Sequence, residues 1–137
     1  MKWRFAGCVA VAVTALAGPA LAHHSAAGID RSKSVTLVGT VRQFGWTNPH
    51  SWMEVDVPAD AGGMVTWKVE MTSPAFLVRA GWKSTTVKPG DRVSVVVRPL
   101  RSGDPGGLFV SVTLPTGQVL GERAVLPAPA PAPAPTP

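Results

Sequence analysis

Apolar and polar residues alternate along the middle of the chain, and this alternation predicts β-strands. In residues 35–42, VTLVGTVR, the positions Val35, Leu37 and Val41 fall on one face and the residues between them on the other. A period of two is typical of a strand with one buried face. The same pattern recurs in SWMEVDV (51–57), MVTWKVEM (64–71), VKPGDRVSVVVRPL (87–100) and LFVSVTL (108–114), and QVLGERAVL (118–126) is a candidate sixth strand. The chain is therefore expected to be mainly β.

One segment carries helix signals instead. In TSPAFLVRAGW (72–82), Ser73 is suited to cap a helix, Pro74 to its first position and Gly81 to the residue just past its end. The residues spaced to bury one face are Phe76, Leu77 and Ala80. The segment predicts a helix of two turns at most.

The order of these elements favours one architecture. Three strands, a short helix and then two strands is the order of an OB-fold, a small five-stranded, partly open barrel with one short helix between strands three and four. A small open β-sandwich is the competing architecture. Because the position of the helix favours the barrel, we predict an OB-fold-like domain over residues 35–126.

Residues 1–22 have the layout of a secretory signal peptide. Lys2 and Arg4 precede an apolar run over residues 5–17, and residues 20–22, Ala-Leu-Ala, form a small-x-small cleavage site. The apolar run is shorter than the roughly 20 residues that a membrane-spanning helix needs. We therefore expect cleavage after Ala22, a periplasmic or secreted protein, and no integral membrane segment once the leader is removed.

Two further segments flank the predicted domain. Residues 23–34, HHSAAGIDRSKS, form an N-terminal segment with a histidine pair. Residues 127–137, PAPAPAPAPTP, alternate proline and alanine and predict an extended, disordered tail. The single cysteine, Cys8, lies in the predicted leader, so the mature chain is expected to hold no disulfide.

The charge of the chain argues against a nucleic-acid partner. The formal net charge is +5, from 13 Lys and Arg against 8 Asp and Glu, and two of the cations belong to the predicted leader. The remaining basic residues are scattered, whereas nucleic-acid binders cluster theirs on one face. We expect the charge to keep the domain soluble.

Several short motifs, in this order, carry a family resemblance. They are HHS (23–25), VTLVGTV (35–41), WTNPHSW (46–52), GW (81–82), KPGD (88–91) and SVTLP (111–115). The chain resembles the small exported bacterial proteins of the DUF6152 family over nearly all of its predicted mature domain. The resemblance implies a periplasmic, β-barrel-like domain and brings no activity with it.

No catalytic motif is recognisable in the sequence. The chain lacks GxSxG, a P-loop, a GxGxxG that opens a helix, and HExxH. Ser25 follows His24, but adjacency in sequence does not make a nucleophile and its base, and no third orienting group is identifiable. We therefore expect a binding protein rather than an enzyme.

The histidines point to a metal ion. If the chain begins at His23, that residue offers both its α-amine and its imidazole, and the amine pKa of about 7.7–8 leaves neutral nitrogen available near neutral pH. A second imidazole, from His24 or His50, would complete a three-nitrogen site similar to a histidine brace. Such nitrogen donors favour a copper-type ion. The opposing interpretation is that residues 23–34 are a leader without a ligand and that His50 only stabilises its turn.

A second hypothesis comes from the aromatic residues. Trp46 and Trp52 flank the turn that holds Asn48 and His50, and aromatic residues on an OB-fold face commonly stack on ligands. These residues would bind an envelope glycan, a peptide or another small ligand. A purely structural or adaptor role is the third hypothesis.

Glu70 has several possible roles at the predicted junction between strand and helix. It could cap the helix, pair with Arg79 or supply an oxygen ligand to a bound ion. Structural pairing is the favoured interpretation, because a carboxylate at the end of a strand usually finds a cation or water.

Overall fold

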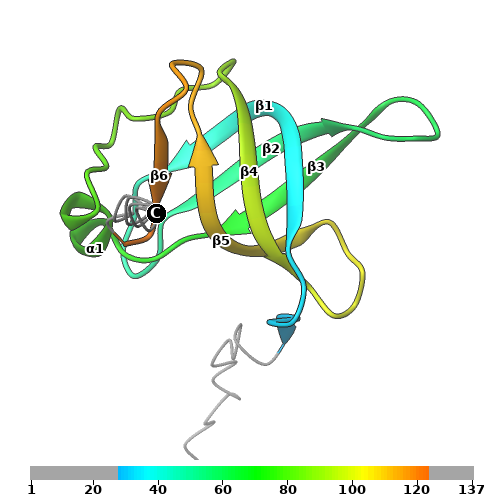
Figure 1. Cartoon of the computed structure of the whole chain (residues 1–137), viewed down its shortest axis with the longest axis horizontal. Coiled ribbons are helices and arrows are strands. Elements are labelled where there is room, and N and C mark those ends of the chain that lie inside the picture. The colour runs from blue at the N-terminus through cyan, green and yellow to red at the C-terminus, as the bar shows by residue number, and fades with distance from the viewer. Residues whose placement is uncertain (1–27, 124–137) are drawn as a thin grey trace, which may run out of the picture.

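β1 is the strand around which the other strands assemble. The computed structural model describes residues 28–123, and its elements follow in the order β1 (Val35–Gly45), β2 (Trp52–Pro58), β3 (Met64–Glu70), α1 (Pro74–Arg79), β4 (Arg92–Pro99), β5 (Gly106–Thr113) and β6 (Val119–Gly121). The first half of β1 pairs antiparallel with β4 and the second half with β2 (Figure 1). Leu37 and Val41 are buried and the residues between them are more exposed, apart from Gly39, as the alternation predicts. A register irregularity between Val41 and Gln43, of the kind that bends a strand, lies where β1 passes from one partner to the other.

A parallel pairing of β3 with β5 closes the curled sheet into a barrel. The strands form one sheet in the order β3-β2-β1-β4-β5-β6, and residues 68–70 of β3 also pair with residues 106–108 of β5. The predicted mainly β, five-stranded OB-fold-like barrel with one short helix is confirmed. The barrel is closed, where the sequence predicted a partly open one. The sandwich alternative is excluded because every named strand belongs to the same sheet.

The closure depends on glycine in β5. A Cβ atom on Gly107 would lie 2.4 Å from the carbonyl oxygen of Arg98 on the neighbouring β4. A Cβ on Gly106 would lie 2.8 Å from a methyl group of Leu100. Because these positions carry no side chain, β5 can approach β4 closely while it pairs with β3 on its other side.

The helix forms where the sequence predicts it, with two differences. Pro74 takes its first position and Gly81, with φ +91°, follows its end, but the hydroxyl of Ser73 makes no capping hydrogen bond. Leu77 is fully buried and Ala80 nearly so, whereas Phe76 is 57% exposed. A helix of six residues buries one narrow face, and Phe76 lies outside it, with the guanidinium of Arg79 above its ring.

The core is apolar and includes one tryptophan with a polar anchor. Trp82 is buried, its ring makes an edge contact with Phe109, and its Nε1 donates a hydrogen bond of 2.8 Å to the carbonyl oxygen of Gly121. This bond satisfies the indole N–H inside the core and fastens β6 to the barrel. β6 is short, and among the described strands its partner is β5.

The start of the described chain is attached to the loop between β4 and β5. Ile29 forms a bridge with Leu100, and the N–H of Asp30 donates to the carbonyl oxygen of Pro99 at 2.8 Å. The N–H of Arg101 donates in turn to the carbonyl oxygen of Gly28. Within residues 28–123, no helix has the length and hydrophobicity needed to cross a membrane.

Gly39→Ala is expected to destabilise the barrel. The added Cβ would lie 2.3 Å from the backbone carbonyl oxygen of Asp56 on β2, which cannot move without disturbing the sheet. Overpacking of this kind costs about 2 kcal/mol, which lowers Tm by about 10 °C in a domain of this size. Thermal unfolding followed by circular dichroism measures the shift. Gly28→Ala is the matched control, since nothing lies within 4 Å of its added Cβ; an equal Tm for both variants would contradict the steric argument.

Candidate functional site

His50 and Glu70 are joined by a hydrogen bond between their side chains. Nδ1 of His50 lies 2.5 Å from Oε1 of Glu70, and the two side chains are 55% and 35% exposed. Because an ionised carboxylate can only accept, the proton of this bond belongs to Nδ1. The other ring nitrogen, Nε2, is then the atom of His50 that is available to a ligand.

The backbone brings this pair together from opposite sides of the β2–β3 hairpin. His50 ends the turn after β1, where the Thr47 hydroxyl donates to its carbonyl oxygen at 2.9 Å and the Asn48–Pro49 peptide bond is cis. Beyond the last register pair of β2 and β3, the N–H of Ser51 donates to the carbonyl oxygen of Thr72. The N–H of Met71 donates back to the carbonyl oxygen of Ser51. His50 precedes Ser51 and Glu70 precedes Met71, so these two hydrogen bonds bring the side chains of His50 and Glu70 together.

A small hollow lies beside the pair, and we call it the histidine hollow. Its volume is about 180 Å³, and it is lined by Ile29, His50, Glu70, Met71, Thr72, Leu108 and Glu122. The hollow therefore collects residues from the start of the described chain, from the turn before β2, from the end of β3, from β5 and from the residue after β6. One histidine and two carboxylates share this small space.

Within the hollow, burial changes the pKa of the Glu122 carboxyl group. Oε1 of Glu122 is buried and has no hydrogen-bond partner among the described residues. Burial raises the pKa of the Glu122 carboxyl, and the neighbouring charge of Glu70 adds to the rise. A backbone hydrogen bond from Thr72 and the charges of Arg123 and His50 act in the opposite direction. The rise means that folding disfavours the ionised form of Glu122.

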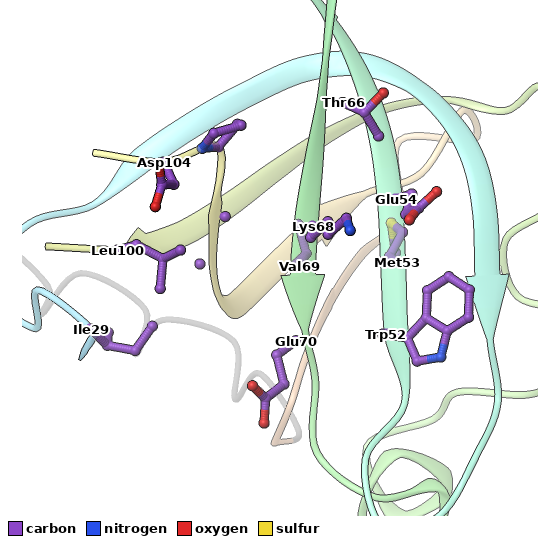
Figure 2. A pocket seen from close by; sticks show the side chains of 13 residues that line it. Ile29, Trp52, Met53, Glu54, Thr66, Lys68, Val69, Glu70, Leu100 and Asp104 are labelled. Atoms are coloured by element: carbon purple, nitrogen blue, oxygen red, sulfur yellow. The ribbon is translucent and has the colours of Figure 1, made fainter. Parts of the chain in front are cut away.

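A larger cavity lies on the outer face of β2 and β3, and we call it the tryptophan cavity. It measures about 700 Å³ and is lined by Ile29, Trp52, Met53, Glu54, Thr66, Lys68, Val69, Glu70, Leu100, Asp104, Pro105, Gly106 and Gly107. Figure 2 shows Trp52 and Glu54 on one side of it and Leu100, Asp104 and Ile29 on the other. A cavity of this size is within the range that holds small organic ligands. It shares Ile29 and Glu70 with the histidine hollow.

The structure separates the residues that the sequence grouped as a ligand site. Trp52 and Glu70 line the tryptophan cavity, and His50 lines the histidine hollow. Trp46 and Asn48 line neither. Trp46 packs partly buried against the core, with its ring in edge contact with Phe44 at 5.9 Å, while Asn48 is exposed in its turn.

The predicted metal ligands are only partly described. His23 and His24 lie outside the described residues, so their relation to His50 stays a prediction. From Gly28 to Arg123, no group of three or more His, Cys, Asp or Glu side chains is arranged to hold a metal ion. No metal site is seen in that part of the chain.

Sequence reasoning did not name His50 as a partner of Glu70, and it missed Glu122. Glu70 hydrogen-bonds His50, while its roles as a cap of the helix or a partner of Arg79 stay predictions. A signal for Glu122 was present: in a strand over residues 118–126, Leu120 and Glu122 point to the same face, which puts a carboxylate beside an apolar position. No local pattern indicated Ile29 or Asp104, because they reach the cavities through contacts distant in sequence.

Comparisons with known proteins identify a family and assign no activity. A family described as one of unknown function, DUF6152, matches residues 10–110, which confirms the resemblance seen in the motifs. No curated protein matches the chain. Among solved structures, the mitochondrial single-stranded DNA binding protein Rim1 of S. cerevisiae is similar, with a TM-score of 0.44 and 11% identity over 60% of this chain and 93% of that one.

Glu122→Gln is expected to stabilise the metal-free protein at neutral pH. The pKa of Glu122 is raised by folding, so its contribution to stability is full below its unfolded pKa and is lost as the pH rises through the folded value. Glutamine stays neutral and keeps the oxygen that accepts from Thr72. We expect the variant to melt a few degrees above the wild type near pH 8, with the gap closing near pH 4. Asp60→Asn, which removes the same charge from an exposed turn, is the control. A difference in Tm between Glu122→Gln and the wild type that does not change with pH would contradict the burial of Glu122.

Proposed function

Because the chain belongs to the DUF6152 family, whose function is unknown, its activity has to be inferred from its own site, and we propose that it is a binding protein for a copper-type ion. In this proposal the chain is exported, is cut after Ala22, and holds the ion between His23 and His50. The observation that carries the proposal is the position of Ile29. It lines the same hollow as His50, so the chain that leads back to His23 starts beside that histidine.

The reach of the N-terminal segment is sufficient for this site. Residues 23–28 precede Ile29, and at about 3.3–3.6 Å per residue they span up to about 20 Å when extended. The histidine hollow, which Ile29 itself lines, has a volume of about 180 Å³, so it extends over a shorter distance than that reach. The α-amine and imidazole of His23 can therefore be delivered to His50 without any change in the barrel.

His50 is suited to be the ligand from the barrel. Glu70 occupies Nδ1, which leaves Nε2 to bind the ion and holds the ring in one orientation. A carboxylate behind a metal-bound histidine also increases the basicity of the ligating nitrogen. The amine and imidazole of His23 with the imidazole of His50 give three nitrogen donors, a set that favours Cu(II) among the divalent ions.

His24 provides the competing arrangement. Its imidazole, together with the amine and imidazole of His23 and the amide nitrogen between the two residues, could chelate the ion without the barrel. The two arrangements differ in one respect that experiment can measure: only the first needs His50 and Glu70.

The proposal is tested by titrating Cu(II) into protein that begins at His23 and recording binding and EPR spectra. Intact mass first establishes where the exported chain begins. His23→Ala and His50→Ala are each expected to weaken binding at least tenfold, because each removes a nitrogen ligand. Glu70→Gln is expected to weaken it by about tenfold as well, the range for losing a partner of a ligating histidine.

The controls separate the alternatives. One extra residue before His23 blocks the amine chelate and should abolish tight binding, while Asp60→Asn should leave it unchanged. If His24→Ala abolishes binding and His50→Ala does not, the ion is held by the N-terminal peptide alone. A chain that does not begin at His23, or that binds Cu(II) equally well without His50, would sink the proposed site.

A further inference from the structure

The lining of the tryptophan cavity combines apolar walls with an excess of negative charge. Ile29, Trp52, Leu100 and Pro105 are among the apolar residues that line it. The charged residues that line it are three carboxylates, Glu54, Glu70 and Asp104, against one ammonium group, that of Lys68. An anionic ligand would meet more repulsion than attraction there.

The charged groups are arranged so that the excess remains negative. Glu54 and Lys68 are register partners across β2 and β3, and Figure 2 shows Lys68 extending toward Glu54. Lys68 therefore offsets the charge on its own side of the cavity. Asp104, which accepts a hydrogen bond of 2.8 Å from the Ser102 hydroxyl, adds negative charge on the opposite side.

Trp52 is held in position by the strand next to it. Gly45 on β1 is its register partner, and a Cβ atom on Gly45 would lie 2.2 Å from the indole ring. The ring therefore lies against bare backbone, in space that any other residue at position 45 would fill. An indole fixed in this way loses little freedom when a ligand binds beside it, and indole is the side chain that attracts cations most strongly through its ring.

We propose that the tryptophan cavity binds an organic cation, with an ammonium group beside Trp52 and the carboxylates and an apolar body against Leu100 and Pro105. Charge complementarity selects the cation, since carboxylates outnumber ammonium groups in the lining. The apolar walls select an alkyl or aryl ammonium compound over a metal ion or a polyhydroxylated sugar. The site is distinct from the proposed copper site, because His50 does not line it, although the two cavities share Ile29 and Glu70.

The test compares three probes with the same alkyl chain: hexyltrimethylammonium, hexan-1-ol and hexanoate. Each is titrated calorimetrically into the chain as isolated from cells, with a chelator present so that bound metal plays no part. Hexyltrimethylammonium is expected to bind at least about tenfold tighter than the alcohol, as for a desolvated cation on an indole. Hexanoate is expected to bind more weakly than either.

The proposal predicts opposite changes in affinity for the ammonium probe in two charge variants. Glu54→Gln should weaken binding of the ammonium probe severalfold, and Lys68→Gln should strengthen it severalfold. Asp60→Asn and Lys83→Gln, which make the same charge changes at exposed positions, should have no effect. Trp52→Leu should weaken binding, and a melting curve shows whether it still folds; if it does not, the two charge variants decide.

Several outcomes would overturn the assignment. Among them are tighter binding of hexanoate, equal binding of the ammonium and the alcohol, and no measurable binding of any probe. Binding of hexanoate that is lost in Lys68→Gln would show that the cavity selects anions. Binding of a neutral oligosaccharide such as maltotriose in place of the ammonium would show that it is a sugar site.

Discussion

The parallel pairing of β3 with β5 is the constraint on which the rest of the structure depends. Residues 68–70 already pair with β2 on one side, and their second pairing joins the two ends of the five-stranded sheet. The bare backbone at Gly106 and Gly107 lets β5 fit between β3 and β4. Without this closure, Glu70 would lie at a free sheet edge and the loop between β4 and β5 would have no wall to face.

Both cavities follow from that closure. The pairing places residues 106 and 107 beside Lys68 and Val69, and the loop that precedes β5 then forms the far wall of the tryptophan cavity. The same loop carries Leu100, which binds Ile29 by a bridge and so directs the start of the described chain toward Glu70. One strand pairing thus connects the barrel, the histidine hollow and the start of the described chain.

The fold could be predicted from the sequence because its signals are local. Alternation identified β1 to β5, and Ser73, Pro74 and Gly81 marked the helix between β3 and β4, which in turn favoured the barrel. Phe76 was misplaced because helical spacing shows which residues share a face and not how much of that face the barrel covers. Closure was underestimated because the pairing of residues 68–70 with residues 106–108 has no local signature.

The candidate site was predictable only in part, for the same reason. The type of residue and its position in a turn singled out His50, and its place at the end of a strand singled out Glu70. Their hydrogen bond joins residues 20 positions apart and depends on the register of β2 and β3, which the sequence does not state. Glu122 joins them only because β6 pairs with β5, and Ile29 only because of its bridge to Leu100.

The closing pairing also has a kinetic consequence. The whole of α1 and β4 lies between its partners in the sequence. Contacts of such high sequence separation slow folding, because a long loop has to be ordered before they form. Until β5 is in place, residues 68–70 of β3 have an unpaired edge on the side away from β2. Open edges of this kind pair readily with other chains. The segment that completes the barrel is therefore also the one that protects the folding chain from aggregation.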